Sequence, residues 1–370
     1  MTAHSKATND IAWADPARSQ AFFSWLSTLA ASDGVPRLDN GSLRLASADA
    51  SFRRYFRINA ATGSDTFIIM DAPPDKEDCK PFASVAELLA QAGLQAPRVL
   101  AWDEPAGFML LNDLGSRTMM EVMAPPLAVD VVVQPSPADH DLYMAAADVL
   151  VRWQLASKPG VLPLYDDALL SREINLFPEW YIGKHRGIAL KPEQQATLDA
   201  AFTLIKASNL DSLDGARVYV HRDFMARNLM VTGQIEEPLG VLDFQDAVYG
   251  PVTYDIASLM RDAFLTVEED FVLDITIRYW QKARKAGLPV GDDFGEFYRA
   301  VEWMGLQRHL KILGIFARLT LRDGKPRYLA DTPRFIKYVR ATCARYRQLG
   351  PLMVLLDEIE GNETRVGYTF

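Results

Sequence analysis

Cysteine is scarce in this chain, with only Cys79 and Cys343 among 370 residues. The two lie far apart and form no C-x-x-C pair, so neither a zinc-binding pattern nor a disulfide framework is predicted. A reducing compartment suits this composition. The segment Met1–Asp15 is polar and contains no apolar core of a signal peptide. We therefore expect a cytoplasmic protein.

Long apolar runs and an excess of basic charge are also lacking. No stretch of about 18 uncharged apolar residues occurs, so no membrane-spanning helix is predicted. Lys and Arg number 39 against 48 Asp and Glu, a net charge of −9. This balance argues against binding to nucleic acid or to anionic membranes. A hydrophobic content of 49% is enough for one large domain or two ordinary ones.

Hydrophobic periodicity divides the chain into a first part that alternates helices with strands and a longer helical remainder. Short strands are expected at 43–45, 52–58, 67–70, 99–102 and 108–111. Helices are expected at 18–32, 81–92, 140–157, 167–184, 192–208, 254–263, 268–286, 294–319 and 333–349. Four prolines and no helical period predict a loop at 124–139.

The motif with the clearest chemistry is H-R-D-x-x-x-x-N at residues 221–228. It follows a short apolar strand, so the Asp223 carboxylate is expected at a strand end, and the Asn228 amide oxygen suits Mg²⁺. A later strand at 239–242 leads to Asp243. A carboxylate near an acceptor hydroxyl and oxygen ligands for a metal are typical of phosphoryl transfer from ATP. The alternative is a set of loop residues that cap turns and helices.

Further segments show that the chain resembles the aminoglycoside phosphotransferase/choline kinase branch of the protein-kinase-like fold. They are 50–57, 70–74, 221–230, 243–255 and 322–329. Within that branch the chain is most similar to bacterial anomeric kinases of N-acetylmuramate and N-acetylglucosamine. The resemblance implies an α+β fold with two lobes, a small antiparallel-sheet N-lobe at 1–111 and a mostly helical C-lobe at 112–370.

The resemblance also implies a reaction and its participants. ATP would phosphorylate the anomeric hydroxyl of N-acetylmuramate or N-acetylglucosamine in peptidoglycan recycling, with Mg²⁺ as cofactor. Asp223 would be the catalytic base, and Asn228 and Asp243 would hold Mg²⁺. Another acceptor, such as an aminoglycoside, choline or a different sugar, stays open, because the net negative charge suits a cation.

Three residues of the motif region are expected to support the catalytic loop. His221 is expected to brace it rather than to act directly. Arg222 is expected either to pair with a nearby carboxylate or to brace the loop. For Asp255, hydrogen-bonded support of the loop and a helix N-cap are equally expected.

The nucleotide is expected to lie against two backbone segments of the N-lobe. The turn at 48–51 would cover the phosphates with N–H groups, although it has no glycine. The segment 110–114 would be the hinge that binds adenine through its backbone. The candidate residues here are Ser51, Leu111, Asn112 and Asp113.

The strand at 67–71 lacks the lysine that normally contacts the phosphates in this fold. Arg53, Arg54 and Arg57 are the nearest cations, and alternation places Arg53 and Arg57 on one face. Arg53 and Arg54 are the candidates for nucleotide binding; an exposed, solvated strand face is the alternative. The missing lysine also keeps open a non-catalytic, nucleotide-binding pseudokinase.

The acceptor is expected at the segment 172–181 and just after Asp243. Carboxylates, an amide and aromatic rings occur there together, as in sugar sites, although an amphipathic helix that breaks at Pro178 is an equal alternative. The candidates are Glu173, Asn175, Glu179, Trp180, Gln245 and Asp246. A lactyl carboxylate would need a cation. The basic residues Arg308, Lys311 and Arg318 share one predicted helix, where a solvated face is the stronger expectation.

Overall fold

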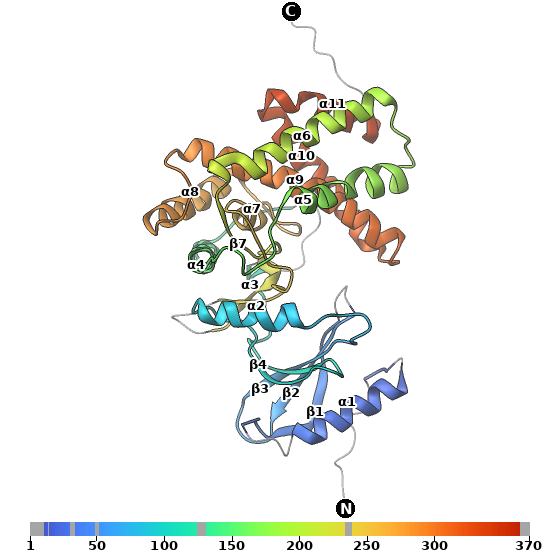
Figure 1. The fold of residues 1–370 in the computed structure, drawn as a ribbon, viewed down its shortest axis with the longest axis vertical. Coiled ribbons are helices and arrows are strands. Elements are labelled where there is room, and N and C mark those ends of the chain that lie inside the picture. The colour runs from blue at the N-terminus through green and yellow to red at the C-terminus, as the bar shows by residue number, and fades with distance from the viewer. Residues whose placement is uncertain are drawn as a thin grey trace, which may run out of the picture. The chain divides into compact units, whose positions relative to one another are not determined.

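The computed structural model describes residues 11–13, 15–29, 34–48, 52–123, 131–233 and 239–362. The chain forms two compact units (Figure 1). The first consists of Met1–Arg117 and Met230–Asp246, and the second of Thr118–Leu229 and Ala247–Phe370. The segment that carries Asp243 thus packs with the sheet-containing unit. A lobe boundary after residue 111 stays a prediction.

The first unit is built on a five-stranded antiparallel sheet with the order β1-β2-β3-β5-β4. The strands are β1 (Leu38–Ala48), β2 (Arg54–Ala60), β3 (Thr66–Asp71), β4 (Val99–Asp103) and β5 (Phe108–Asn112). All five predicted strands are present. Alternation along each strand sends successive side chains to opposite faces of this sheet.

Two helices cover the sheet, α1 (Pro16–Leu29) and α2 (Lys80–Gln91). They lie on opposite faces of it (Figure 1). Phe22 of α1 packs against Phe56 of β2 and Phe108 of β5, with ring centroids 5.1 and 5.4 Å apart. Burial of large aromatic rings accounts for much of the stability of such a small core. The chain leaves α2 through Gly93 in the left-handed conformation, at φ +71°, which glycine adopts readily after a helix.

The second unit is mostly helical. Its α-helices are α3 (Met119–Met123), α4 (Pro137–Leu155), α5 (Asp167–Ile174), α6 (Pro192–Gly215), α7 (Tyr254–Met260), α8 (Glu269–Lys285), α9 (Phe294–Leu321), α10 (Thr332–Arg345) and α11 (Gly350–Glu360). The other helical elements are the π-helix η1 (Phe177–His185) and the 3₁₀-helices η2 (Ala226–Asn228), η3 (Pro326–Asp331) and η4 (Arg347–Leu349). None of the described helices is long and apolar enough to cross a membrane.

Short strand pairs complete the structure. β7 (Arg217–Val220) pairs with β10 (Val248–Pro251), β6 (Val132–Val133) with β11 (Thr266–Val267), and β8 (Leu229–Val231) with β9 (Leu239–Val241). β7, β8 and β9 carry the predicted motif residues at their ends. The strand-like pieces expected between 218 and 242 are therefore confirmed.

Three expectations about elements need correction. The helix predicted at 167–184 is divided into α5 and η1, because Pro178 cannot donate the hydrogen bond that would continue α5. The loop predicted at 124–139 contains β6, and α4 begins at Pro137, since a proline is tolerated in the first helical turn. Residues 124–130 lie outside the described part. The helix α11 was not predicted.

The helix α9 is central to the second unit and is buried along most of its length. Gly314 of α9 is necessary for its close contact with η1. A Cβ atom at Gly314 would lie 2.3 Å from the backbone carbon and oxygen of Leu176. The missing side chain therefore allows α9 to pass directly against the turn between α5 and η1.

Candidate active site

The predicted catalytic loop, as we call residues 221–228, begins where β7 ends, at His221, Arg222 and Asp223. Asp255, in the first turn of α7, holds this backbone: its carboxylate accepts the N–H of His221 at 2.7 Å and that of Arg222 at 2.9 Å. Burial raises the pKa of Asp255, and the hydrogen bonds and nearby cations oppose that shift. Of the two expected roles, loop support describes Asp255, because Thr253 occupies the N-cap position.

His221 and Asn228 stabilise the loop around Asp223. The Asp223 N–H donates to His221 Nδ1 at 3.2 Å, as expected for a bracing residue. Asn228, at the end of η2, donates its Nδ2–H to the Asp223 carbonyl at 2.8 Å. A backbone N–H of η2, from Ala226, donates to the buried carboxylate of Asp262 at 3.2 Å. The loop is thus fixed on both sides of the Asp223 side chain.

Arg222 has a left-handed backbone conformation, at φ +77°, which is costly for a residue with a side chain. Its guanidinium lies 2.5 Å from Glu173 of α5. Glu173 also accepts hydrogen bonds from Lys311 Nζ at 2.7 Å, the Tyr165 hydroxyl at 2.7 Å and Gln307 at 3.2 Å. Arg222 therefore pairs with a carboxylate, one of the two roles expected for it.

The electrostatics of Glu173 follow from its two cationic partners. Burial alone would raise its pKa, but the charges and hydrogen bonds of Lys311 and Arg222 outweigh burial, and the net pKa lies well below the ordinary value. Glu173 is therefore ionised at neutral pH although its side chain is buried. Every group named above that binds the Glu173 carboxylate is a side chain of the protein itself. We therefore assign Glu173 to support of the loop rather than to contact with the sugar.

Arg308 and Lys311 of α9 do not form a solvated face, and that expectation is wrong for both. Arg308 is 2% exposed and Lys311 is 7% exposed. Arg308 donates to the Arg222 carbonyl at 2.5 Å and stacks over the Tyr254 ring at 4.9 Å. Both cations are therefore used behind the catalytic loop. The sequence did not reveal that these two side chains are buried, because the same helix carries polar residues on its other faces as well.

Asp243 belongs to the first unit and lies two positions after the end of β9. Its backbone is left-handed, at φ +61°, which is unusual for aspartate and typical of functional turns. The Gln245 amide donates to Asp243 Oδ1 at 2.9 Å, and Phe244 packs on Phe82 of α2 with ring centroids 4.9 Å apart. Asp243 and Asp246 are exposed. This turn therefore presents a carboxylate to solvent on a fixed backbone.

The described residues contain no group of three or more His, Cys, Asp or Glu side chains able to hold a metal ion. A Zn²⁺ site needs such a group. Mg²⁺ needs fewer protein ligands, because it keeps several waters and shares the phosphates of its nucleotide. An amide oxygen from Asn228 and a carboxylate from Asp243 fit that requirement. Each of these two side chains is therefore a type of donor that a nucleotide-bound Mg²⁺ accepts.

The arginines near the predicted phosphate turn all have carboxylate partners. Arg53 contacts Glu77 at 3.1 Å and is 8% exposed, so the alternative of a solvated face is wrong for it. Arg57 contacts Asp113. The turn residues 49–51, and Ser51 with them, lie outside the described residues.

The side chain of Arg54 makes contacts that hold the first unit together. It stands opposite Asp71 in the β2–β3 register and contacts its carboxylate at 2.9 Å. Asp71 also accepts from Arg18 of α1 at 2.6 Å. The Arg54 guanidinium stacks over the Trp13 ring at 4.0 Å. Arg54 therefore joins the sheet to the segment before α1.

The predicted hinge residues use their side chains inside the sheet. Leu111 is buried, and the Asn112 side-chain oxygen accepts the Arg98 N–H. Asp113 accepts from Arg57 and from the Thr66 hydroxyl at 2.7 Å. Burial would raise the pKa of Asp113, but these hydrogen bonds lower it overall. Adenine binding by the backbone of 110–114 stays a prediction, because the backbone of β5 pairs with β3 and with β4.

The other acceptor candidates belong to different units of the chain. Asn175 is exposed at the end of α5. Glu179 pairs with Lys184 at 3.1 Å, and Lys184 lies 3.4 Å over the Trp180 ring. Gln245 and Asp246 belong to the Asp243 turn in the first unit. The α5–η1 candidates thus lie at the surface, apart from Glu173.

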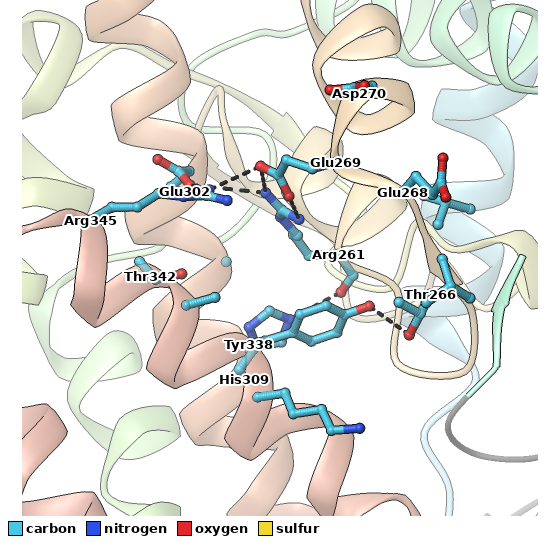
Figure 2. A pocket seen from close by; sticks show the side chains of 15 residues that line it. Arg261, Thr266, Glu268, Glu269, Asp270, Glu302, His309, Tyr338, Thr342 and Arg345 are labelled. Carbon is cyan, nitrogen blue, oxygen red and sulfur yellow. Dashed lines mark hydrogen bonds and ion pairs between the residues drawn. The ribbon is translucent and has the colours of Figure 1, made fainter. Parts of the chain in front are cut away.

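A pocket of about 600 Å³ opens in the second unit (Figure 2). It is lined from the end of α7, the start of α8, α9 and α10. Its polar lining includes Arg261, Thr266, Glu268, Glu269, Asp270, Glu302, His309, Lys337, Tyr338, Thr342 and Arg345. The sequence carried no motif for this pocket, because its residues come from β6 and β11 as well as from these four helices.

Comparison with known proteins identifies the family. A profile of the phosphotransferase enzyme family matches residues 42–292. A protein of Neisseria meningitidis serogroup B, named N-acetylmuramate/N-acetylglucosamine kinase, is 48% identical over 89% of this chain and 94% of its own length. A protein of Pseudomonas aeruginosa with the same name is 46% identical over 93% and 98%. The chain therefore belongs to the phosphotransferase enzyme family.

Solved structures agree on the fold. A putative aminoglycoside phosphotransferase from Ralstonia eutropha superposes with a TM-score of 0.60 at 13% identity, covering 94% of this chain and 99% of that one. A choline kinase from Cryptosporidium parvum gives 0.60 at 11% identity, covering 90% and 98%. The expected α+β fold, with a small antiparallel sheet and a mostly helical remainder, is confirmed.

Proposed function

We propose that this protein transfers the γ-phosphoryl group of ATP to the anomeric hydroxyl of N-acetylmuramate or N-acetylglucosamine, in peptidoglycan recycling in the cytoplasm. The support is twofold. Relatives named for this activity are 46–48% identical to the chain over most of its length. The observation that carries the proposal is the catalytic loop, where Asp255, His221 and Asn228 hold the backbone around Asp223.

Asp223 is the catalytic base of this proposal. It accepts the proton of the anomeric hydroxyl as that oxygen attacks the γ-phosphorus, and ADP leaves. An anomeric hydroxyl is more acidic than an ordinary alcohol, so the main contribution of Asp223 is to orient the nucleophile.

Asn228 and Asp243 are the proposed ligands of Mg²⁺, which when bound neutralises charge on the β- and γ-phosphates. Arg53 is the proposed replacement for the missing phosphate lysine, because it is a buried cation that follows the predicted phosphate turn by two positions in the sequence. Arg54 braces the sheet instead. The backbone of 110–114 is the proposed adenine hinge.

The test is transfer from ATP, with Mg²⁺, to N-acetylglucosamine, N-acetylmuramate, choline and kanamycin. We expect an acid-labile anomeric phosphate on the two amino sugars, detected by phosphorus NMR. Asp223→Asn should lower kcat by about 10² to 10⁴-fold, while Asp199→Asn, at an exposed position of α6, should leave it unchanged. Turnover confined to choline or kanamycin would overturn the proposal. ATP binding with no turnover would indicate a pseudokinase.

A further inference from the structure

Two buried carboxylates, one at the start of α7 and one just beyond its end, hold different parts of the predicted catalytic loop. Asp255, in the first turn of α7, accepts the N–H groups of the two residues that precede Asp223. Asp262 lies two positions after the end of α7, and its Oδ2 accepts the N–H of Ala226 at 3.2 Å. Asp255 therefore fixes the loop before Asp223, and Asp262 fixes it after Asp223.

The two oxygens of the Asp262 carboxylate bind different segments. Oδ1 accepts the N–H groups of Phe264 at 2.6 Å and of Leu265 at 3.3 Å, which closes the turn 262–265. Oδ2 binds Ala226, which comes 36 positions earlier in the chain. Asp262 is 2% exposed. A carboxylate can accept on both sides, whereas an amide of the same shape carries donors on one side. The residue type therefore suits a link between this turn and the loop.

The residue after Ala226 makes a second contact with the same turn. The Arg227 guanidinium lies 4.6 Å from the centroid of the Phe264 ring, which is a cation–π contact. Phe264 in turn packs on Phe316 of α9, with ring centroids 6.1 Å apart. The first two residues of η2 are therefore both held by the turn 262–265, and the third residue of η2 is Asn228.

The turn 262–265 is itself anchored to α10. Arg334, which is 6% exposed, donates to the Ala263 carbonyl at 3.0 Å. The hydroxyl of Tyr338, in the next turn of α10, donates to Thr266 at 2.9 Å (Figure 2). Hydrogen bonds in a buried environment are strong and restrict the groups that they join. The turn is therefore a fixed support against which η2 is held.

We propose that Asp262 is a positioning residue for the metal ligand Asn228: by holding the Ala226 N–H, it fixes η2 in the place from which the Asn228 amide oxygen can reach a nucleotide-bound Mg²⁺. Asp255 and Asp262 then have separate tasks, because Asp255 positions the base and Asp262 positions the metal ligand. Groups that hold the ligands of a metal change its affinity when they are replaced. The inference rests on the proposed function, since ATP, Mg²⁺ and the part played by Asn228 come from there.

Asp262→Asn tests the link with little change in size. Oδ1 accepts two N–H groups and Oδ2 accepts one, so we expect the amide oxygen to face the turn and the NH₂ group to face the Ala226 N–H, donor against donor. The affinity of the protein for Mn²⁺ in the presence of ADP, measured by electron paramagnetic resonance, should fall about tenfold. The Mg²⁺ concentration for half-maximal phosphoryl transfer should rise by a similar factor, with kcat at saturating Mg²⁺ within about twofold of wild type.

Two further variants separate positioning from a general loss of stability. Asp139→Asn is the matched control, because Asp139 is a buried carboxylate of the same unit that accepts the N–H of Ser136 at the start of α4. It should lower the melting temperature and leave the Mn²⁺ affinity unchanged. Asp255→Asn is the contrast, since it should lower kcat at saturating Mg²⁺ by a larger factor than it lowers the Mn²⁺ affinity.

Phe264→Leu tests the same support without replacing a buried carboxylate. The ring is half-buried, and leucine keeps an apolar side chain while the contact with Arg227 is lost. We expect the Mn²⁺ affinity with ADP to fall about threefold. If Asp262→Asn does not fold, unchanged Mn²⁺ affinity in Phe264→Leu overturns the inference.

The inference and the proposed function fail in different ways. If the wild type phosphorylates an amino sugar and both folded variants bind Mn²⁺ as the wild type does, Asp262 only closes its own turn, and the proposed function stands. If the wild type binds Mn²⁺ with ADP but phosphorylates no amino sugar, the proposed function is wrong, and the Mn²⁺ affinities of the variants still decide whether Asp262 positions Asn228.

Discussion

The guanidinium of Arg222 lies 2.5 Å from the carboxylate of Glu173, so the catalytic loop is ion-paired to a helix that precedes it by 49 positions. Lys311 contacts the same carboxylate oxygen from α9. The pair is buried, and it holds Arg222 in a backbone conformation that is unfavourable by itself. The next residue is the proposed catalytic base, so the orientation of Asp223 depends on this contact.

Glu173→Gln should therefore impair turnover more than binding. The change leaves Lys311 and Arg222 buried without their anion, which costs about 3–5 kcal/mol of folding free energy. We expect kcat to fall at least about tenfold, with the KM values for ATP and sugar within about twofold, in assays below the unfolding transition. Glu193→Gln, at an exposed position of α6, is the control. Unchanged kcat in folded Glu173→Gln would show that the pair only stabilises the fold.

The lowered pKa of Glu173 predicts how the stability of the fold depends on pH. Its pKa is lower in the folded protein than in the unfolded chain, so its ionised form favours folding at pH values above about 4.5. As the pH falls below that value, the unfolded chain takes up the proton and the contribution is lost. Urea unfolding should therefore show a difference between wild type and Glu173→Gln that is larger at pH 7 than at pH 3.5. A difference independent of pH would contradict this origin.

Substitutions of Arg53 and Arg54 should have different effects, the first on the KM for ATP and the second on the stability of the fold. Arg53→Gln should raise the KM for ATP about tenfold without changing the KM for sugar. Arg54→Gln should lower the melting temperature, because Asp71 and Trp13 lose a partner, and leave the KM for ATP unchanged. Initial rates and thermal unfolding measure both. The reverse pattern would assign the phosphate contact to Arg54.

Asn228→Ala should change the metal requirement. Loss of one oxygen ligand should raise the Mg²⁺ concentration for half-maximal rate about tenfold, measured at fixed ATP. Asn228→Asp keeps an oxygen and should need less additional Mg²⁺ than Asn228→Ala. Equal Mg²⁺ curves for wild type and Asn228→Ala would remove Asn228 from the metal site.

Gly314→Ala should destabilise the second unit. Its Cβ would lie 2.3 Å from the Leu176 backbone, so α9 and η1 would have to move apart, at a cost of about 1–3 kcal/mol or more. Gly350→Ala is the control, because a Cβ there meets nothing within 4 Å. Thermal unfolding that is equal for the two variants would show that α9 and η1 separate freely.

Local patterns in the sequence determined much of the fold. Period-two alternation placed all five strands of the first sheet, and helical periodicity placed most of the helices. The boundaries were less certain where proline occurs. Pro178 ended α5 early, while prolines at the starts of α4 and α11 were compatible with new helices. A proline removes the same donor in both cases, and only its position in the helix decides the outcome.

The residues of the H-R-D-x-x-x-x-N motif and Asp243 could also be identified from the sequence. They lie close together along the chain, so their spacing forms a recognisable pattern. The tertiary structure alone decided which groups surround them. It buried Arg308 and Lys311 behind the loop, paired Glu173 with Arg222, and assembled the pocket around His309 from α7, α8, α9 and α10. These contacts join residues far apart along the chain. Burial and pairing across such distances depend on how helices pack, which no local pattern encodes.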